Sequence, residues 1–306
     1  MMTSISNSNA ISVPSPAAFP AWPGRSFCCR VLSMLSLLLL PLTAGAAEGT
    51  SFQLQRLDVS TALERADLIR LDARPRSHWQ QGHLPNALSF SWEDYSRTDP
   101  DGVKYRVWPP AELAAALGAC GIDEHSALLL YGDGDSSWGG EGWLAWLLAW
   151  LGHQGPVYLL DGGIQAWQAA GAPLSQEIAQ PAATKTYQVT LNRALNCSAS
   201  DIKQRGTTWQ LVDTRSYFTE WLPGHLPGAV HLHWEKFFQG ADRRPLDASQ
   251  LRQLLRAQGI DPHQPVVYYC TGGIRSGYAW MVHQLAGLPA AINFEGGTEE
   301  WAARNH

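Results

Sequence analysis

The sequence has little charge, few cysteines and none of the motifs that indicate a cofactor. Only 16% of its 306 residues are charged, and the net charge is −5. Because a nucleic-acid partner usually requires a basic face, this balance argues against one. No glycine-rich phosphate loop is present, and no spacing among the 10 histidines is typical of a zinc site. The sequence therefore predicts a globular protein that needs no metal and no cofactor.

The N-terminal region differs in composition from the rest of the chain. An apolar run, Val31–Leu40, follows two arginines and precedes small residues, among them Ala44 and Ala46. The run is too short to span a bilayer, which takes about 20 apolar residues. A positive flank, a short apolar core and an A-x-A exit predict a secretory signal peptide over residues 1–46. The mature protein would then be periplasmic or secreted and free of the membrane. An uncleaved anchor and a mitochondrial presequence are the alternatives.

Removal of that peptide reduces the five cysteines to three, Cys120, Cys197 and Cys270. Three is a poor number for a disulfide framework. Two alternatives stay open for the first two cysteines, which either form one bridge or lie buried and unpaired. In both cases Cys270 keeps a free thiol.

The rest of the chain is an internal repeat. Three segments recur in the same order at long offsets: Leu68–Phe90 with Leu211–Leu232, Glu112–Gly132 with Gln250–Cys270, and Val157–Gly171 with Ala291–Asn305. A repeat of this length indicates duplication of a whole domain. We therefore predict a first domain at 52–175, a linker at 176–195 and a second domain at 196–306.

Each copy alternates short apolar runs with helical patterns. Strands are expected at Leu68–Leu71, Leu128–Tyr131, Val157–Leu160, Leu211–Val212, Val266–Tyr269 and Ala291–Phe294, and helices at Glu112–Leu117 and Gln250–Ala257. Such alternation predicts an α/β fold in which each domain is a parallel sheet flanked by helices. Ligands bind such sheets where a strand ends and the next helix begins, and Cys270 falls at that point.

The residues after Cys270 suit a reactive thiol. Gly272 and Gly273 permit positive φ, so that successive backbone N–H groups can surround an anion. The N-terminus of the following helix and Arg275 add positive charge. These features favour the thiolate, which is the nucleophilic form of cysteine. Cys270 is therefore the predicted catalytic residue.

Four segments together, "YYCTGGIRSGYA", "LVDTRS", "PGHLPGAVHL" and "FEGGTEEWAARN", resemble the rhodanese family. The resemblance covers both halves and implies tandem domains with five-stranded parallel cores that transfer sulfane sulfur through a cysteine persulfide. It makes Cys270 the persulfide cysteine. It also implies that Arg215 lies near an anionic substrate and that Asp213 orients a loop. The substrate-binding loop would consist of Thr271, Gly272, Gly273, Ile274 and Arg275.

The first copy departs from this pattern, because Gly132 stands opposite Cys270. The loop that follows offers Asp133 and Asp135, whose charges would repel both thiosulfate and a thiolate. We therefore expect an inactive first domain that walls the cleft of the second. His83 and His225 recur in both copies, so they are expected to brace a turn.

The expected activity is transfer of sulfur from thiosulfate, or a similar small anionic donor, to a thiol or cyanide. Two-domain animal members resembling this chain have a hydroxyl residue where Arg275 stands, which disfavours mercaptopyruvate as the donor. An exported persulfide carrier with a protein sulfur acceptor is one alternative hypothesis. A cysteine phosphatase is the other, but its loop would be one residue longer.

Overall fold

Apolar strands and helices alternate in both halves of the chain, as the repeat predicts. The computed structural model describes residues 52–181, 183–289 and 291–304. The predicted signal peptide, residues 1–46, lies outside them. The described residues belong to one compact unit. None of their helices combines the length and the apolar composition needed to cross a bilayer.

The first half is built on a five-stranded sheet, in the order β1-β7-β6-β2-β3, with all neighbours parallel. Its strands are β1 (Leu54–Leu57), β2 (Ile69–Asp72), β3 (Leu88–Ser89), β6 (Leu128–Tyr131) and β7 (Val157–Leu160). The other elements are α1 (Val59–Glu64), α2 (Arg76–Gln81), α3 (Trp92–Tyr95), α4 (Pro110–Ala119), α5 (Gly140–Leu151), α6 (Gly163–Ala169) and an antiparallel pair, β4 (Ser96–Arg97) and β5 (Arg106–Val107).

The second half repeats this plan with a four-stranded parallel sheet, in the order β13-β12-β8-β9. Its strands are β8 (Gln210–Asp213), β9 (Val230–His231), β12 (Val266–Tyr269) and β13 (Ala291–Phe294), with an antiparallel pair, β10 (Phe238–Gln239) and β11 (Arg244–Pro245). The helices are α7 (Ala199–Arg205), α8 (Ala248–Ala257), α9 (Ile274–Leu285) and α10 (Gly297–Ala303), with short turns η1 (Arg193–Leu195), η2 (Gly206–Thr208), η3 (Tyr217–Trp221) and η4 (Trp234–Phe237).

The fifth strand that the family resemblance implies for the second half is reduced to one bridge. Asn196 pairs with Asn293 of β13, at the place where β1 pairs with β7 in the first half. The side-chain oxygen of Asn196 accepts hydrogen bonds from the backbone N–H groups of Cys197 and Glu295. These side-chain bonds take the place of a longer backbone ladder.

Local sequence explains why the elements begin where they do. Asp247 caps α8, since its carboxylate accepts from the N–H of Gln250, whose side chain accepts from the N–H of Asp247 in return. Leu251 and Leu255, one turn apart, are buried on the inner face of this helix. The apolar run of β12 is buried at all four positions, as a central parallel strand requires.

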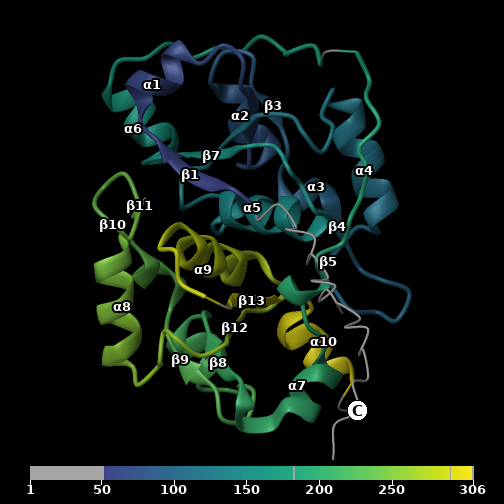
Figure 1. The fold of residues 1–306 in the computed structure, drawn as a ribbon, viewed down its shortest axis with the longest axis vertical. Coiled ribbons are helices and arrows are strands. Elements are labelled where there is room, and N and C mark those ends of the chain that lie inside the picture. The colour runs from purple at the N-terminus through teal and green to yellow at the C-terminus, as the bar shows by residue number, and fades with distance from the viewer. Residues whose placement is uncertain (1–51, 182, 290, 305–306) are drawn as a thin grey trace, which may run out of the picture. The chain divides into compact units, whose positions relative to one another are not determined.

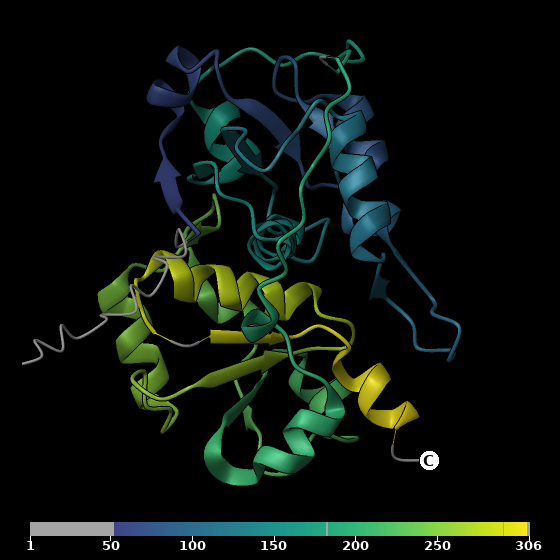
Figure 2. The same cartoon turned by 45° about the vertical axis from the view of Figure 1, so that its right-hand side comes forward.

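Helices α5 and α9 join the two halves. They lie against each other between the two sheets (Figures 1 and 2). A Cβ atom at Gly142 would lie 2.2 Å from the Cα of Tyr278, and one at Gly277 would lie 2.9 Å from the Cα of Trp143. The two glycines therefore allow the helix backbones to approach closely. One hydrophobic cluster spans both halves through this contact, and a separate cluster fills the far side of each sheet.

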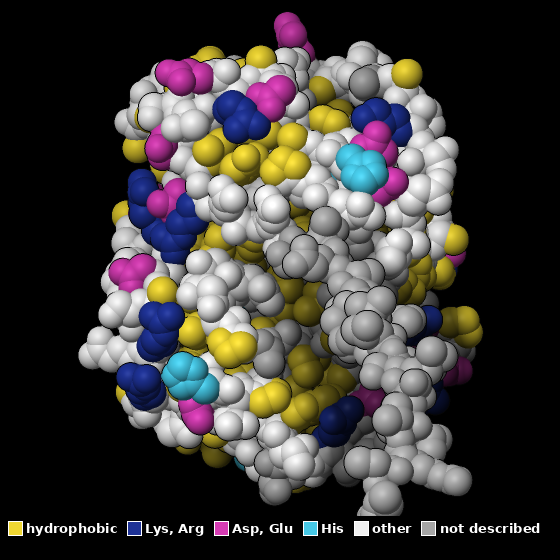
Figure 3. Space-filling view, viewed as in Figure 1, with side chains coloured by type: hydrophobic (Ala, Val, Ile, Leu, Met, Phe, Trp, Pro, Cys, Tyr) yellow, Lys and Arg dark blue, Asp and Glu magenta, His cyan; other side chains and the backbone are white. Residues whose placement is uncertain are grey.

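Charged side chains are distributed without a large patch of one sign on the face shown in Figure 3. Basic and acidic groups neighbour one another there, and several pairs cross between the halves. Arg244, for example, contacts Asp161 of the first half at 3.0 Å. This mixed surface fits the small net charge of −5.

Candidate active site

Cys270 lies at the junction of β12 and α9, as the sequence predicts. The strand ends at Tyr269 and the helix begins at Ile274. The cysteine side chain is buried, and the hydroxyl of Ser276 lies 3.6 Å from its sulfur as a hydrogen-bond donor. A cysteine at the start of a 12-residue helix is exposed to the positive end of the helix dipole.

The two glycines of the loop serve different purposes. Gly273 has φ +84°, as predicted, and starts the helix from a left-handed conformation. Gly272 could also adopt a positive φ, but its φ in this structure is not positive. A Cβ atom at Gly272 would lie 2.3 Å from the Cβ of Tyr105, so this position needs glycine for space.

The backbone of the loop offers donors for an anion. The N–H groups of Thr271, Gly272 and Gly273 donate to no acceptor in the described part of the chain. They belong to the three residues that follow Cys270, at the amino end of α9. Unpaired N–H groups at a helix N-terminus bind anions readily.

Arg275 is held by a carboxylate that the sequence analysis did not predict. Its two terminal nitrogens donate to Glu220 at 2.6 and 2.7 Å, and one of them also donates to the hydroxyl of Thr271 at 2.9 Å. Burial lowers the pKa of Arg275, but Glu220 and the Cys270 sulfur raise it by more. Partial burial would raise the pKa of Glu220, but Arg275 outweighs this effect and holds that pKa at about 2. Both groups are therefore charged at neutral pH.

A one-residue difference between the copies brings Glu220 to this place. Seven residues separate Asp213 from Trp221, whereas six separate Asp72 from Trp79 in the first copy. The extra residue winds η3 as a π-helix where the first copy has the α-helix α2. Glu220 directly precedes Trp221, so it occupies the position that His78, directly before Trp79, has in the first copy. Comparison of the two repeats at single-residue spacing would have revealed this position.

Arg215 does not lie where the family resemblance predicts. Its guanidinium donates to Asp213 at 2.6 Å and to the carbonyl of Gly224 at 2.8 Å, and it is buried away from the pocket. Arg74 makes the same two bonds in the first copy, to Asp72 and Gly82. Because the arrangement recurs in both copies, we assign it to bracing the turn after β2 and β8, and correct the expected contact with substrate.

The histidines of the repeated "GHLP" unit also lie at this turn. His83 contacts the carbonyl oxygen of Trp79, and His225 contacts that of Trp221. Each histidine ring stacks on the same tryptophan. They brace the turn, as the sequence predicts.

A pocket of about 370 Å³ opens above Cys270. The second half contributes Glu220, Cys270, Thr271, Gly272, Ile274 and Arg275 to its lining, and the first half contributes Trp92, Tyr105 and Trp138. The first half therefore walls this cleft, as expected. Of the predicted loop residues, Gly273 alone is absent from the lining.

The matching loop of the first half has no such chemistry. Helix α5 begins after Gly139 as α9 begins after Gly273, both left-handed, so that Glu141 takes the position of Arg275. Burial raises the pKa of Glu141 to about 8. A Cβ atom at Gly132 would lie 2.1 Å from the Glu141 carboxylate, so a cysteine here would require Glu141 to move.

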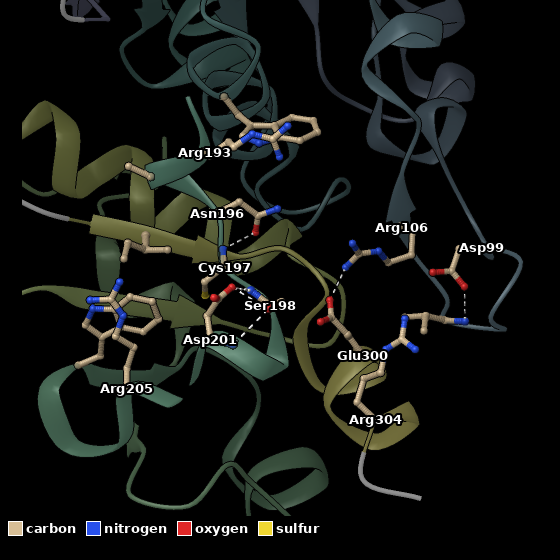
Figure 4. Close-up of a pocket in the computed structure, with 15 residues that line it drawn as sticks. Asp99, Arg106, Arg193, Asn196, Cys197, Ser198, Asp201, Arg205, Glu300 and Arg304 are labelled. Atoms are coloured by element: carbon tan, nitrogen blue, oxygen red, sulfur yellow. Dashed lines mark hydrogen bonds and ion pairs between the residues drawn. The ribbon is translucent and has the colours of Figure 1, made fainter. Parts of the chain in front are cut away.

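A second cavity, about 600 Å³, lies elsewhere and is lined partly by Cys197 (Figure 4). Arg106 reaches this cavity from the first half and contacts Glu300 at 2.7 Å. Burial, and then the charges of Asp201 and Glu300, raise the pKa of Cys197, which keeps it a thiol. Burial also raises the pKa of Cys120. Both have free thiols in this structure, so they form no bridge here, and neither fits a nucleophile.

The site thus combines a single cysteine, free backbone donors and a paired arginine, a set that suits the reaction of a thiol with an anionic compound. Comparison with known proteins gives the family. Residues 57–170 and 198–304 match the profile of the rhodanese-like domain. The chain belongs to the rhodanese family.

Several of its relatives are named as sulfurtransferases, and one relative, from Thermus thermophilus, is named as a sulfur carrier protein. A "Probable 3-mercaptopyruvate sulfurtransferase" of Pseudomonas aeruginosa is 32% identical, with 79% of this chain and 92% of the relative covered. A thiosulfate sulfurtransferase of the same organism is 26% identical, with 81% and 92% covered. The fold is similar to that of SseA from Escherichia coli, whose crystal structure is described as a 3-mercaptopyruvate sulfotransferase with the rhodanese fold. The TM-score is 0.70 at 19% identity, and the match covers 79% of this chain and 98% of SseA. Sulfur transfer is therefore the general activity of the family to which this chain belongs.

Proposed function

We propose that this protein transfers sulfane sulfur from thiosulfate, or a similar anionic donor, to a thiophilic acceptor through a persulfide on Cys270. The observation that supports this most is the position of Cys270 directly before three loop residues with unpaired N–H groups, at the start of α9. The Cys270 thiolate attacks the outer sulfur of thiosulfate, a Cys–S–S bond forms, and the donor's S–S bond breaks. The bonding electrons leave with sulfite, whose charge the loop donors and Arg275 stabilise.

The second half-reaction regenerates the enzyme. A thiol or cyanide attacks the outer sulfur of the persulfide, and the Cys270 thiolate departs. Such a double displacement predicts ping-pong kinetics, and the acceptor thiol could belong to a small molecule or to a protein. Only the second domain would react, because the first has Gly132 in place of Cys270 and Glu141 in place of Arg275.

The decisive experiment compares two cysteine variants in the thiosulfate:cyanide reaction. Cys270→Ser should abolish turnover and the gain of one sulfur atom in the intact mass after thiosulfate treatment. Cys197→Ser is the matched control and should retain both, since its thiol lies outside the pocket. Turnover by Cys270→Ser would refute the proposal.

The donor is the second point to test, because the relatives carry both names. Arg275 brings a positive charge to the pocket lining, and we propose that thiosulfate is used with a higher kcat/KM than 3-mercaptopyruvate. Steady-state kinetics with both donors on one preparation measures this directly. A higher kcat/KM for 3-mercaptopyruvate would reverse the assignment.

We also propose that the protein acts outside the cytoplasm, on the strength of the N-terminal apolar segment. Expression of the full chain and of a chain lacking residues 1–46, followed by cell fractionation, tests this. Export of the full chain alone is the expected outcome, and equal distribution of the two would contradict it.

A further inference from the structure

The two antiparallel hairpins make reciprocal contacts between the halves. Arg106 of β5 contacts the carboxylate of Glu295, the residue after β13, at 2.8 Å. In the opposite direction, Arg244 of β11 contacts Asp161, the residue after β7, at 3.0 Å. Each half thus extends a hairpin arginine to the acid that follows the last sheet strand of the other half.

The residue before each of these arginines has a left-handed backbone conformation. Tyr105 has φ +61° and Arg243 has φ +54°, a region that side chains larger than glycine rarely adopt. A Cβ atom at Gly272 would lie 2.3 Å from the Cβ of Tyr105, and one at Gly134 would lie 2.9 Å from that of Arg243. Both glycines are the third residue after their strand, β12 or β6. The two hairpins therefore press on the same position of the two loops, and these contacts enforce the left-handed conformations.

In the half that has the nucleophile, the hairpin arginine binds two carboxylates. Arg106 also contacts Glu300 of α10 at 2.7 Å, and the N–H of Val107 donates to Glu295 at 2.7 Å (Figure 4). A Cβ atom at Gly296 would lie 2.3 Å from a guanidinium nitrogen of Arg106, so the backbone before α10 lies against the guanidinium. The side chain of Glu295 is only 1% exposed. Because a buried carboxylate requires its cation, Arg106 holds the start of α10 in place.

The start of α10 in turn holds the Cys270 loop. The carbonyl of Cys270 accepts a hydrogen bond from the N–H of Thr298 at 2.9 Å, and the carbonyl of Thr271 accepts one from the N–H of Glu299 at 3.2 Å. Gly297, with φ +54°, lets the two segments approach, since a Cβ atom there would lie 2.4 Å from both carbonyl oxygens. Arg106 is thus connected to the reactive loop through α10.

These bonds also set the direction of two free donors of the loop. In a planar trans peptide unit the C=O and N–H groups point in opposite directions. No peptide bond among the described residues is cis. Because the carbonyls of Cys270 and Thr271 point to α10, the N–H groups of Thr271 and Gly272 point away from it. Both are among the unpaired N–H groups that the proposed function assigns to the departing sulfite.

We infer that Arg106 is a positioning residue for sulfur transfer, which from the first half fixes the start of α10 and thereby the direction of the loop N–H groups that bind the departing sulfite. This inference rests on the proposed function, which supplies the reaction that those donors assist. Arg106 does not line the Cys270 pocket, so it acts through Glu295, Glu300 and the backbone that they hold. Arg244 makes the equivalent contact on the half without a nucleophile and has no such role.

The test compares Arg106→Ala with Arg244→Ala in the thiosulfate:cyanide reaction, since both remove one arginine that joins the halves. Arg106→Ala should lower kcat by about tenfold to a hundredfold, because an error of about 1 Å in a reacting geometry costs up to about a hundredfold. The change in KM should be smaller, since these donors act on the charge that develops in the transition state. Arg244→Ala should leave kcat nearly unchanged.

A conservative variant and a folding control complete the kinetic test. Arg106→Lys keeps the charge but offers a single nitrogen, so it should recover part of the lost kcat. Thermal unfolding verifies that each variant is folded at the assay temperature, and Arg106→Lys serves for the comparison if Arg106→Ala does not fold. Equal losses of kcat on replacing Arg106 and Arg244, or no loss for either, would show that the contact only joins the halves and would overturn the inference.

A binding measurement keeps the inference separate from the proposed function. Calorimetry with sulfite on the persulfide-free protein requires no sulfur transfer. We expect Arg106→Ala to bind sulfite about tenfold more weakly than the natural protein, the size expected for one lost hydrogen bond to a charged group. Arg244→Ala should bind sulfite as the natural protein does, and equal binding by the two variants would contradict the positioning role. Weaker binding in Arg106→Ala alone, in a protein whose Cys270 forms no persulfide with thiosulfate, would instead refute the proposed function.

Discussion

Replacing Glu220 by glutamine removes one negative charge from the Cys270 pocket and changes the size of the side chain very little. The carboxylate makes two bonds to Arg275, and its pKa is about 2 against an ordinary value of 4.5. Taken in full, that difference corresponds to about 3 kcal/mol of stability. The side chain is 26% exposed, so solvent reduces the figure, and we expect a loss of about 1–3 kcal/mol at pH 7.

The dependence on pH follows from the direction of this shift. The folded protein keeps Glu220 ionised at a pH where the unfolded chain takes up a proton. The stabilisation is therefore complete above the unfolded value of 4.5 and is lost as pH falls through about 2. Urea unfolding of both proteins should show a stability difference that shrinks by more than half between pH 7 and pH 3.

Kinetics adds a second readout for the same variant. Without Glu220 the charge of Arg275 is no longer balanced, so the KM for thiosulfate should fall several-fold. Glu64→Gln serves as the control, since Glu64 is exposed and lies outside the pocket. An unchanged stability at pH 7, or a difference that stays constant down to pH 3, would show that the Glu220–Arg275 pair does not have the role assigned to it.

Three further predictions concern the packing that holds the site. Gly142→Ala would place a methyl group 2.2 Å from the Cα of Tyr278, and should lower the free energy of unfolding by about 1–3 kcal/mol in urea. Arg106→Ala leaves the buried carboxylate of Glu295 without its cation at 2.8 Å, and should cost about 3 kcal/mol by the same assay. Burial lowers the pKa of His283 to about 4, so the free energy of unfolding falls as pH drops below 6.5. The expected fall is about 2 kcal/mol between pH 7.5 and pH 5. His283→Gln should lack this dependence on pH.

Each of these predictions has a matched control. Gly224→Ala meets open space and should change stability little. Arg97→Ala breaks an exposed pair with Glu112, and a cost as large as that of Arg106→Ala would contradict the argument from burial. His125→Gln replaces an exposed histidine, and its stability should keep the pH dependence of the natural protein.

The sequence was sufficient to predict the two α/β halves and the position of Cys270 between a strand and a helix. Runs such as Val266–Tyr269 are buried on both faces, and their apolar composition alone locates the strands. The single cysteine at a strand–helix junction could be found because backbone position fixes its environment. These features depend on neighbours in the chain, which a sequence displays directly.

Features that depend on distant contacts were beyond the sequence. Arg215 has the residue type and the motif of a substrate ligand, but Asp213 and the Gly224 carbonyl already occupy its donors. Glu220 reaches Arg275 only because one extra residue turns an α-helical segment into a π-helix. Trp138 stands in a loop whose composition predicted only inactivity. In each case the role of the side chain depends on residues that lie near it in the fold but far from it in the sequence.

The packing of α5 on α9 explains why the two copies diverged at the same loop. Each loop leads into one of these helices, and the helices approach closely at Gly142 and Gly277, so each loop faces the other half of the molecule. A short loop exposes the start of its helix and can hold a nucleophile among free N–H groups. A long loop covers that start and extends toward the neighbouring pocket. Two short loops would leave the Cys270 pocket without Trp138 as a wall, so the longer loop of the first copy completes the pocket of the second.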